Sequence, residues 1–369
     1  MSRTLLPLSF TAILMGGAAF ADVPHVAVDI APVHALVARV MEGVGTPDLI
    51  VQPGASPHEY SLRPSEAAAL QNSDLVFWIG ADLTPWLTDT IGTLAPEAAV
   101  TALLETDGTV ALEFREGALF EAHDHSDHAD EDDHASHDDH DDHDDHAEDD
   151  HDDHDDHDDH GKEGHDDHAK DDHDDHAEDD HDDHDDHAEE EAGHEGHNHG
   201  AHDPHAWLSP RNAMTWLNVV AGQLSAADPD NAGAYFANAS AGRAEIEALI
   251  AEVNATLAPV REGQFIVFHD AYQYFEADFD FPASGAISLG DASDPSPARI
   301  AEIQGRIAEQ GIDCVLSEPQ FNPGLVATVL DGTEAKTGIL DPLGSDLEPG
   351  SALYPQLIRN LSTALAGCM

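Results

Sequence analysis

Histidine and aspartate repeat through a tract from His123 to His202, largely as the tripeptide Asp-Asp-His. The tract holds 23 of the 28 histidines and 39 of the 76 acidic residues of this 369-residue chain. Imidazoles are the commonest protein ligands for zinc, copper and nickel, so the composition predicts metal binding. The tract has few apolar side chains to bury and is expected to be disordered. A plain acidic tether is the alternative, but a tether does not need a histidine at nearly every third position.

Four short segments outside the tract place histidine or aspartate where a predicted strand ends or a loop meets a helix. They contain His58, His205, His269 and Asp341. Three imidazoles and one carboxylate would form a tetrahedral zinc site. Each residue also has a structural interpretation: a surface loop for His58, the end of the tract for His205, a core hydrogen bond for His269 and a turn before proline for Asp341.

Strands that alternate with helices are predicted on both sides of the tract, which indicates parallel sheets covered by helices. Before the tract we predict strands at 25–30, 48–52 and 74–80, and helices at 33–41 and 65–71. After it we predict helices at 210–226, 297–310, 323–330 and 354–366, another helix from Asp270, and strands at 264–268, 312–317 and 337–340. Ligands bind beyond the carboxyl ends of strands in such sheets, and His269 and Asp341 are expected there.

A helix of about 27 residues is predicted from Asn231 to Leu257, after the helix-start signal Asp228-Pro229-Asp230. Its length of about 40 Å suits a strut between two lobes. We therefore expect an N-terminal α/β lobe at 22–227, a connecting helix at 228–258 and a C-terminal α/β lobe at 259–369.

The formal net charge of −63 excludes nucleic-acid binding, since such a surface repels polyanions and attracts cations. Residues 1–21 resemble a secretory signal, with Arg3, an apolar run from Leu5 to Phe20, and the small-x-small cleavage site Ala19-Phe20-Ala21. The mature protein is expected in an extracytoplasmic space, most simply a periplasm. In that oxidising space the two cysteines, Cys314 and Cys368, form a disulfide more often than two free thiols or metal ligands.

Five segments resemble, in the same order, the cluster A-I (cluster 9) solute-binding proteins of ABC importers. The segments are Pro53 to Ser65, Asp203 to Pro210, Val267 to Tyr272, Cys314 to Phe321 and Leu340 to Gly344. The resemblance covers the mature chain except the tract, and it implies a periplasmic zinc-binding protein of the ZnuA type. The implied fold has two Rossmann-like lobes with parallel sheets, joined by one long rigid helix, with the metal in the cleft between the lobes.

The resemblance also implies particular roles for residues. The three histidine ligands of the family correspond to His58, His205 and His269, and its carboxylate position corresponds to Asp341. Some members carry Glu directly before the first histidine, where this chain has Pro57, so Asp341 or water is left as the fourth ligand. The Cys314–Cys368 pair is similar to a disulfide of zinc-specific members.

Zinc is the expected ligand, because nitrogen donors favour zinc over manganese. The alternative is the manganese and iron branch of the family, which typically has a carboxylate where this chain has His269. The implied partner is an ABC permease with a separate ATPase subunit, because this chain lacks a Gly-x-x-x-x-Gly-Lys-[Ser/Thr] phosphate loop. We further expect a monomer and, as another candidate partner, a periplasmic zinc chaperone.

Two other classes of protein share part of this pattern. A secreted zinc hydrolase could use three histidines to activate water, with Glu59 as base, but no H-E-x-x-H helix is present. A pure metal-storage protein would leave the lobes to bind another solute.

Overall fold

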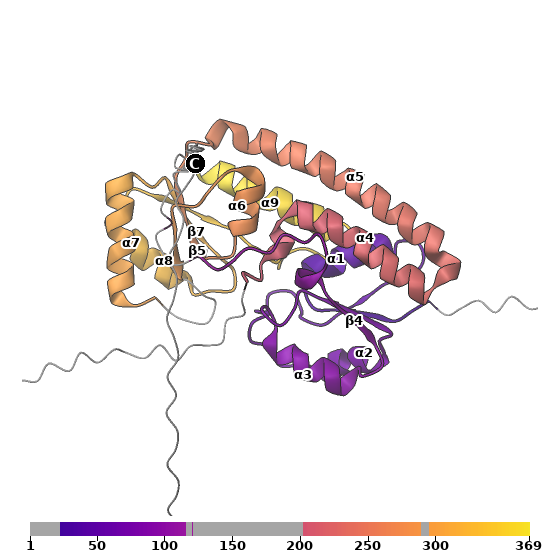
Figure 1. Cartoon of the computed structure of the whole chain (residues 1–369). Coiled ribbons are helices and arrows are strands. Elements are labelled where there is room, and N and C mark those ends of the chain that lie inside the picture. Colours follow the sequence, from indigo (N-terminus) through magenta and orange to yellow (C-terminus); the bar gives the residue numbers. More distant parts are fainter. Residues whose placement is uncertain (1–22, 116–119, 121–201, 289–294) are drawn as a thin grey trace, which may run out of the picture. The chain divides into compact units, whose positions relative to one another are not determined.

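The computed structural model describes residues 23–115, 120, 202–288 and 295–369. The predicted signal segment, and the tract apart from His202, lie outside these described residues. The described part contains two four-stranded sheets in which all strand pairs are parallel, with helices packed against them (Figure 1). The α/β class with two parallel sheets is therefore confirmed.

The first sheet is formed by the chain before the tract. Its strands lie in the order β2-β1-β3-β4, and they are β1 (Val26–Val28), β2 (Asp48–Leu49), β3 (Leu75–Trp78) and β4 (Ala99–Ala102). Its helices are α1 (Ala31–Val40), α2 (Pro64–Asn72) and α3 (Pro85–Leu94), followed by the 3-10 turn η1 (Leu103–Glu105). The central strands β1 and β3 are apolar and buried throughout, as expected of parallel strands covered on both faces.

The second sheet repeats this plan with the order β6-β5-β7-β8. Its strands are β5 (Phe265–His269), β6 (Gly285–Ser288), β7 (Cys314–Ser317) and β8 (Lys336–Ile339). Its helices are α6 (Gln273–Phe279), α7 (Pro297–Gln310), α8 (Pro323–Leu330) and α9 (Leu353–Cys368). The predicted disulfide is confirmed: Cys314 at the start of β7 is bonded to Cys368 at the end of α9.

Two long helices lie between the sheets in sequence: α4 (Pro210–Ala227) and α5 (Ala232–Leu257). The 3-10 turns η3 (Ala206–Leu208), η4 (Pro229–Asn231) and η5 (Ala258–Val260) flank them. Asp228 ends α4, and its buried carboxylate accepts hydrogen bonds from the side-chain amide of Asn231 at 2.7 Å and from the Tyr235 hydroxyl at 2.8 Å. Helix α5 packs against α1 and α4 and also against α9, so it contacts helices associated with both sheets (Figure 1).

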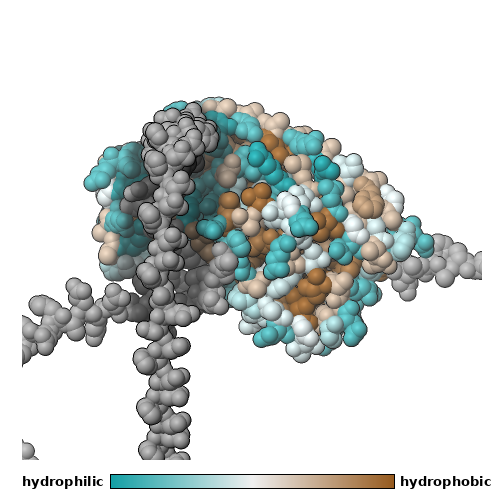
Figure 2. All heavy atoms as spheres, in the orientation of Figure 1, coloured by the Kyte–Doolittle hydropathy of each residue, from teal (hydrophilic) through white to brown (hydrophobic). Residues whose placement is uncertain are grey.

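One apolar core runs through both sheets and the helices beside them, and its large buried side chains include Trp207, Tyr235 and Tyr354. On the face shown in Figure 2, apolar residues form small areas separated by polar ones. Among the described residues, no helix combines the length and the apolar character that crossing a bilayer requires.

Several element boundaries differ from those predicted. Helix α3 and strands β4 and β6 were not predicted. Helix α6 begins at Gln273 rather than at Asp270, because the chain bends after β5, where the Ala271 amide donates to the His269 carbonyl at 2.9 Å. His269 is the last residue of β5 rather than the residue after it, and Asp341 lies two residues beyond β8.

Candidate metal centre

His269 is held at the carboxyl edge of the second sheet. It ends the central strand β5, its side chain is buried, and its Nδ1 lies 2.6 Å from Oε1 of Glu318. Glu318 directly follows β7, the strand next to β5. The Phe321 ring packs edge-on against the His269 ring, with 5.3 Å between centroids. The carboxyl ends of neighbouring parallel strands meet at one edge, which brings these residues together.

His205 lies just after the tract, in the segment that leads into η3, and it is also buried. Its Nδ1 lies 2.7 Å from Oδ1 of Asp203, and the same oxygen accepts a hydrogen bond from the His205 amide at 3.0 Å. The indole of Trp207, two residues further on, donates to the Pro342 carbonyl at 2.8 Å. The segment around His205 is thereby tied to the loop that follows β8.

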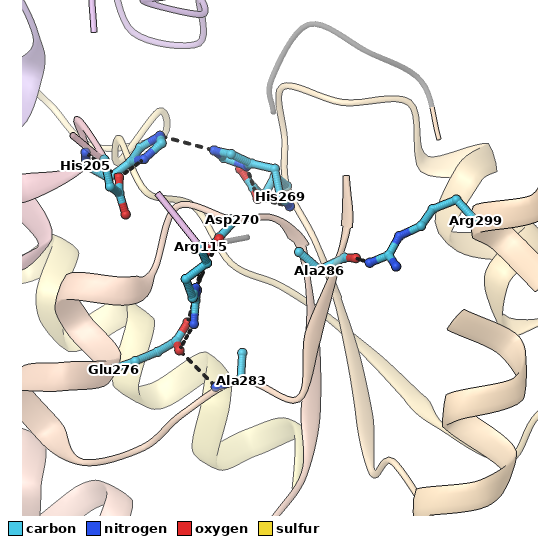
Figure 3. A network of polar contacts seen from close by, with 10 residues as sticks. Arg115, His205, His269, Asp270, Glu276, Ala283, Ala286 and Arg299 are labelled. Atoms are coloured by element: carbon cyan, nitrogen blue, oxygen red, sulfur yellow. Dashed lines mark hydrogen bonds and ion pairs between the residues drawn. The ribbon is translucent and has the colours of Figure 1, made fainter. Parts of the chain in front are cut away.

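The two buried imidazoles have the spacing of zinc ligands. A carboxylate only accepts hydrogen bonds, so each Nδ1 carries a proton, and in a neutral imidazole the Nε2 then presents a lone pair. The Nε2 atoms of His205 and His269 lie 3.4 Å apart and face each other (Figure 3). Two nitrogens bound tetrahedrally at about 2.0–2.1 Å from one Zn²⁺ would lie about 3.3–3.4 Å apart. The donor chemistry and this spacing therefore fit zinc.

His58 joins these two residues from the loop between β2 and α2. Its ring centroid lies 5.7 Å from that of His205. The loop is fixed by the Trp86 indole, which donates to the Pro57 carbonyl at 2.8 Å. All three histidines line one cavity, which has a volume of about 20 Å³. The described residues contain no group of three or more His, Cys, Asp or Glu side chains already arranged to hold one metal ion.

Asp341 lies near this cavity but is not among its lining residues. Its carboxylate accepts hydrogen bonds from its own loop: from the amides of Leu343 and Gly344 at 3.0 and 3.1 Å on Oδ1, and from that of Ser345 at 2.6 Å on Oδ2. The side-chain amide of Gln320, which does line the cavity, donates to Oδ1 at 3.3 Å. The structure thus brings the three histidines together. Asp341 does not line their cavity, but it is hydrogen-bonded to Gln320, which does.

Sequence reasoning missed Asp203, Glu318 and Gln320 as functional residues. A carboxylate that accepts from the far nitrogen of a ligand histidine sets its tautomer and orientation. Asp203 could have been found, because it lies two residues before a candidate ligand. Glu318 could not, because its contact with His269 depends on β7 being the neighbour of β5, and Gln320 could not, because its contacts depend on the loops after β7 and β8 meeting.

A second polar network lies beside the histidines and is centred on Arg115, shortly before the tract (Figure 3). Its half-buried guanidinium forms ion pairs with Asp270, the residue after His269, and with Glu276 of α6, the latter at 2.7 Å. The Ala283 amide also donates to Glu276, at 3.1 Å. Burial raises the pKa of Glu276, and the charge of Arg115 partly offsets that rise. Arg115 therefore pairs with the buried Glu276 and the partly buried Asp270 next to the candidate ligands.

The chain segments before and after the tract are bonded to each other. The Asp203 amide donates to the Leu112 carbonyl at 2.8 Å. The Tyr274 hydroxyl of α6 links the same two residues, because it donates to the Asp203 carbonyl at 2.7 Å and accepts from the Leu112 amide at 2.9 Å. The residue whose carboxylate orients His205 is thus fixed directly to the chain that enters the tract.

Residues 26–368 match the family described as "Zinc-uptake complex component A periplasmic", or ZnuA. The chain belongs to the ZnuA family. The high-affinity zinc uptake system protein ZnuA of Brucella abortus (strain 2308) is 43% identical over 364 residues, which cover 99% of this chain and 97% of that protein. The protein of the same description from Paracoccus denitrificans (strain Pd 1222) is 42% identical over 350 residues, with 95% and 93% coverage.

Solved structures show the same fold. A crystal structure of a zinc-bound ZnuA deletion mutant has a TM-score of 0.63 at 19% identity and covers 94% of this chain and 98% of that one. The solute-binding protein FpvC of Pseudomonas aeruginosa, in complex with Mn²⁺, has a TM-score of 0.64 at 16% identity, with the same coverage. Membership of the ZnuA family makes this chain a solute-binding component of zinc uptake and not an enzyme.

Proposed function

We propose that this chain captures Zn²⁺ with His58, His205 and His269 and delivers it to an ABC-type membrane permease. The observation that carries the proposal is the 3.4 Å between the Nε2 atoms of His205 and His269. Two lone pairs that face each other at this distance repel, and a cation between them turns the repulsion into two bonds. His58 is proposed to move toward this pair and supply the third nitrogen, with Asp341 or water as the fourth ligand.

Zinc is proposed over manganese because of this donor set. Three imidazoles match zinc, whereas manganese prefers carboxylate and water oxygens. His269 is decisive, because a carboxylate at that position would give the mixed set of the manganese and iron branch. The hydrogen bonds that the two imidazoles donate to Asp203 and Glu318 favour the same choice, since they make both imidazoles stronger ligands for a metal.

Capture requires only that the chain's own side chains bind the ion and hold the imidazoles in the right orientation. Both Nδ1 protons stay on the carboxylate side, and both Nε2 atoms face the incoming ion. Zinc competes with protons for imidazole nitrogen, so we expect affinity to fall as the pH drops through the range near 6.5 in which imidazoles titrate. Release then requires the lobes to move His58 away from the other two histidines, which we assign to docking on the permease.

Proteins of this family are periplasmic. We propose that this chain reaches the periplasm through a cleavable signal at 1–21 and acts as a monomer. Its proposed partners are a permease subunit with a separate ATPase, and a periplasmic zinc chaperone. The lobes are proposed to span 22–227 and 259–369, with 228–258 as the rigid connection.

The test is a competition titration with a zinc chelator on a chain in which residues 123–195 are replaced by a short linker. His58→Ala is expected to weaken zinc binding by at least 100-fold, because one of three nitrogen ligands is lost. His25→Ala is the matched control, since His25 is exposed and lies away from the cavity. One zinc held with unchanged affinity by the His58→Ala chain would contradict the proposal.

The same replacement tests the tract. We propose that the tract holds zinc weakly and raises its effective concentration near the histidines. Buffering of excess zinc without transfer is the alternative. If loading from dilute zinc is as fast without residues 123–195 as with them, the transfer role is wrong.

A further inference from the structure

The side-chain amide of Gln320 is bonded through its nitrogen, and Gln320 is one of the residues that line the cavity. Gln320 lies two residues after Glu318, in the turn that follows β7 and closes with the Phe321 amide donating to the Glu318 carbonyl at 3.3 Å. Its Nε2 donates to Oδ1 of Asp341 at 3.3 Å and to Oγ of Ser345 at 3.1 Å. These two acceptors determine which way the amide group faces.

The other end of this amide is a buried acceptor. Oε1 of Gln320 is shielded from solvent and has no hydrogen-bond partner among the residues the structure describes. A buried carbonyl without a donor destabilises a fold, so such a group in a native structure calls for an explanation. The oxygen and nitrogen of an amide diverge from one carbon. Since Nε2 faces Asp341 and Ser345, Oε1 faces away from them, and Gln320 lines the same cavity as the three histidines.

Both carboxylate oxygens of Asp341 already accept hydrogen bonds, which disfavours direct binding of a metal ion. Its Oδ1 already accepts from Leu343, Gly344 and Gln320, and its Oδ2 accepts a short bond from Ser345. Turning either oxygen toward the histidines would break amide bonds that shape the loop after β8. The same loop is held on its other side by the Trp207 indole, which donates to the Pro342 carbonyl.

We propose that the fourth ligand of the zinc ion is a water molecule that donates a hydrogen bond to Oε1 of Gln320. Asp341 is then a positioning residue, which acts on the metal by holding the Gln320 amide. This inference rests on the proposed function, since it presumes zinc between the three histidines. A held water also gives the ion a replaceable ligand, so a group of the partner can take its place during transfer.

The test uses the full-length chain and the variants Gln320→Ala, Gln320→Met, Asp341→Asn and Gln320→Ala/Asp341→Asn. Gln320→Met retains most of the side-chain volume without an acceptor, so it separates loss of the hydrogen bond from loss of packing. Gln310→Ala, an exposed glutamine at the end of α7, is the matched control. Zinc affinity is measured by chelator competition, and the His58→Ala chain gives the background that the tract contributes.

We expect Gln320→Ala and Gln320→Met to weaken zinc binding by about 10- to 100-fold, as is typical when a group that supports a metal ligand is lost. Asp341→Asn should weaken it by no more than this, and the double variant should match Gln320→Ala alone, because Asp341 acts through Gln320. The visible spectrum of Co²⁺ bound in the same place should keep its band positions in Asp341→Asn, because the ligand atoms are unchanged.

Three results would overturn the inference: unchanged affinity in both Gln320 variants, additive losses in the double variant, or a changed Co²⁺ spectrum in Asp341→Asn. The last two would make Asp341 a direct ligand. These outcomes are distinct from failure of the proposed function, which would appear as a His58→Ala chain that binds zinc as tightly as the natural chain.

Discussion

Glu318 accepts a hydrogen bond from Nδ1 of His269 at 2.6 Å, although the two residues are 49 positions apart in the sequence. The bond joins the ends of two neighbouring strands, β5 and β7. The register of the second sheet therefore determines how the His269 imidazole is oriented. The Nε2 lone pair of His269 faces His205 because Glu318 holds the opposite side of the ring.

Glu318→Gln should weaken zinc binding by about 10- to 100-fold, with little change in fold. Glutamine has the same shape, but it lacks the charge that makes the imidazole a strong donor. Chelator competition measures the loss. Glu309→Gln, the same change at an exposed position of α7, should have no effect. If the two variants bind zinc equally well, the carboxylate does not support the metal site.

Arg115→Ala should lower the free energy of unfolding by about 3–5 kcal/mol, because it leaves Asp270 and Glu276 buried without a counter-charge. Urea unfolding of the metal-free protein measures this loss. Arg359→Ala breaks an ion pair with Glu252 in which both side chains are exposed, and it should cost less than about 1 kcal/mol.

The Arg115→Ala loss should also depend on pH. Burial raises the pKa of Glu276 above its ordinary value of 4.5, and removing Arg115 raises it further. A raised pKa in the folded state favours the protonated acid, so its stabilising effect is complete below pH 4.5 and declines as the pH rises. The variant should therefore lose more stability at pH 8 than at pH 5, and adding Glu276→Gln should remove much of this pH dependence. A loss of equal size at both pH values would contradict this account.

Asp29 should make the fold more stable in acid than at neutral pH. It lies after β1, fully buried, where its carboxylate accepts from the amides of Ile30 and Ile79, both at 2.7 Å. Burial outweighs these bonds and raises the pKa of Asp29 to about 7. The stabilising effect of the protonated acid is thus complete below about pH 4 and lost as the pH rises to about 7. It amounts to at most about 4 kcal/mol.

Asp29→Asn should remove this slope between pH 4 and pH 7 in urea unfolding curves. Asp89→Asn, the same change at an exposed position of α3, should retain it. A full slope in the Asp29→Asn chain would mean that other groups produce it.

Loss of the Cys314–Cys368 disulfide should lower the free energy of unfolding by about 4 kcal/mol, because the unfolded chain is no longer closed over 54 positions. Urea unfolding with and without reductant measures the difference. A Cys314→Ala/Cys368→Ala chain should unfold like the reduced natural chain and should not respond to reductant. Equal stability in both forms would show that α9 holds its place by packing alone.

Much of the fold could be predicted because its elements are locally marked. Proline at the first or second position, which cannot donate and fits a helix start, marks the beginnings of α4, α7 and α8. The starts of these three helices were predicted to the residue. Strand β4, by contrast, reads Ala-Val-Thr-Ala and is partly exposed at the edge of its sheet. Its pairing with β3 makes it a strand, and that pairing is not local.

The candidate site also has a part that local sequence predicts and a part that depends on non-local contacts. The three histidines could be proposed from their residue type and their places at strand ends or in loops. That His205 and His269 face each other depends on Asp203 and Glu318, and Glu318 becomes a neighbour only when the strand order places β7 beside β5. The environment of Asp341 is equally non-local, because the bond from Gln320 requires the loops after β7 and β8 to meet.

The hydrogen bond from the Asp203 amide to the Leu112 carbonyl has a consequence for changes in the length of the tract. It joins two residues that are 91 positions apart in the sequence, so the described chain before and after the tract is held together whatever the number of residues between them. Doubling the length of a flexible loop adds only about 0.6 kcal/mol to the entropy cost of closing it. A change in the number of Asp-Asp-His units should therefore change the number of histidines with little effect on the stability of the two sheets.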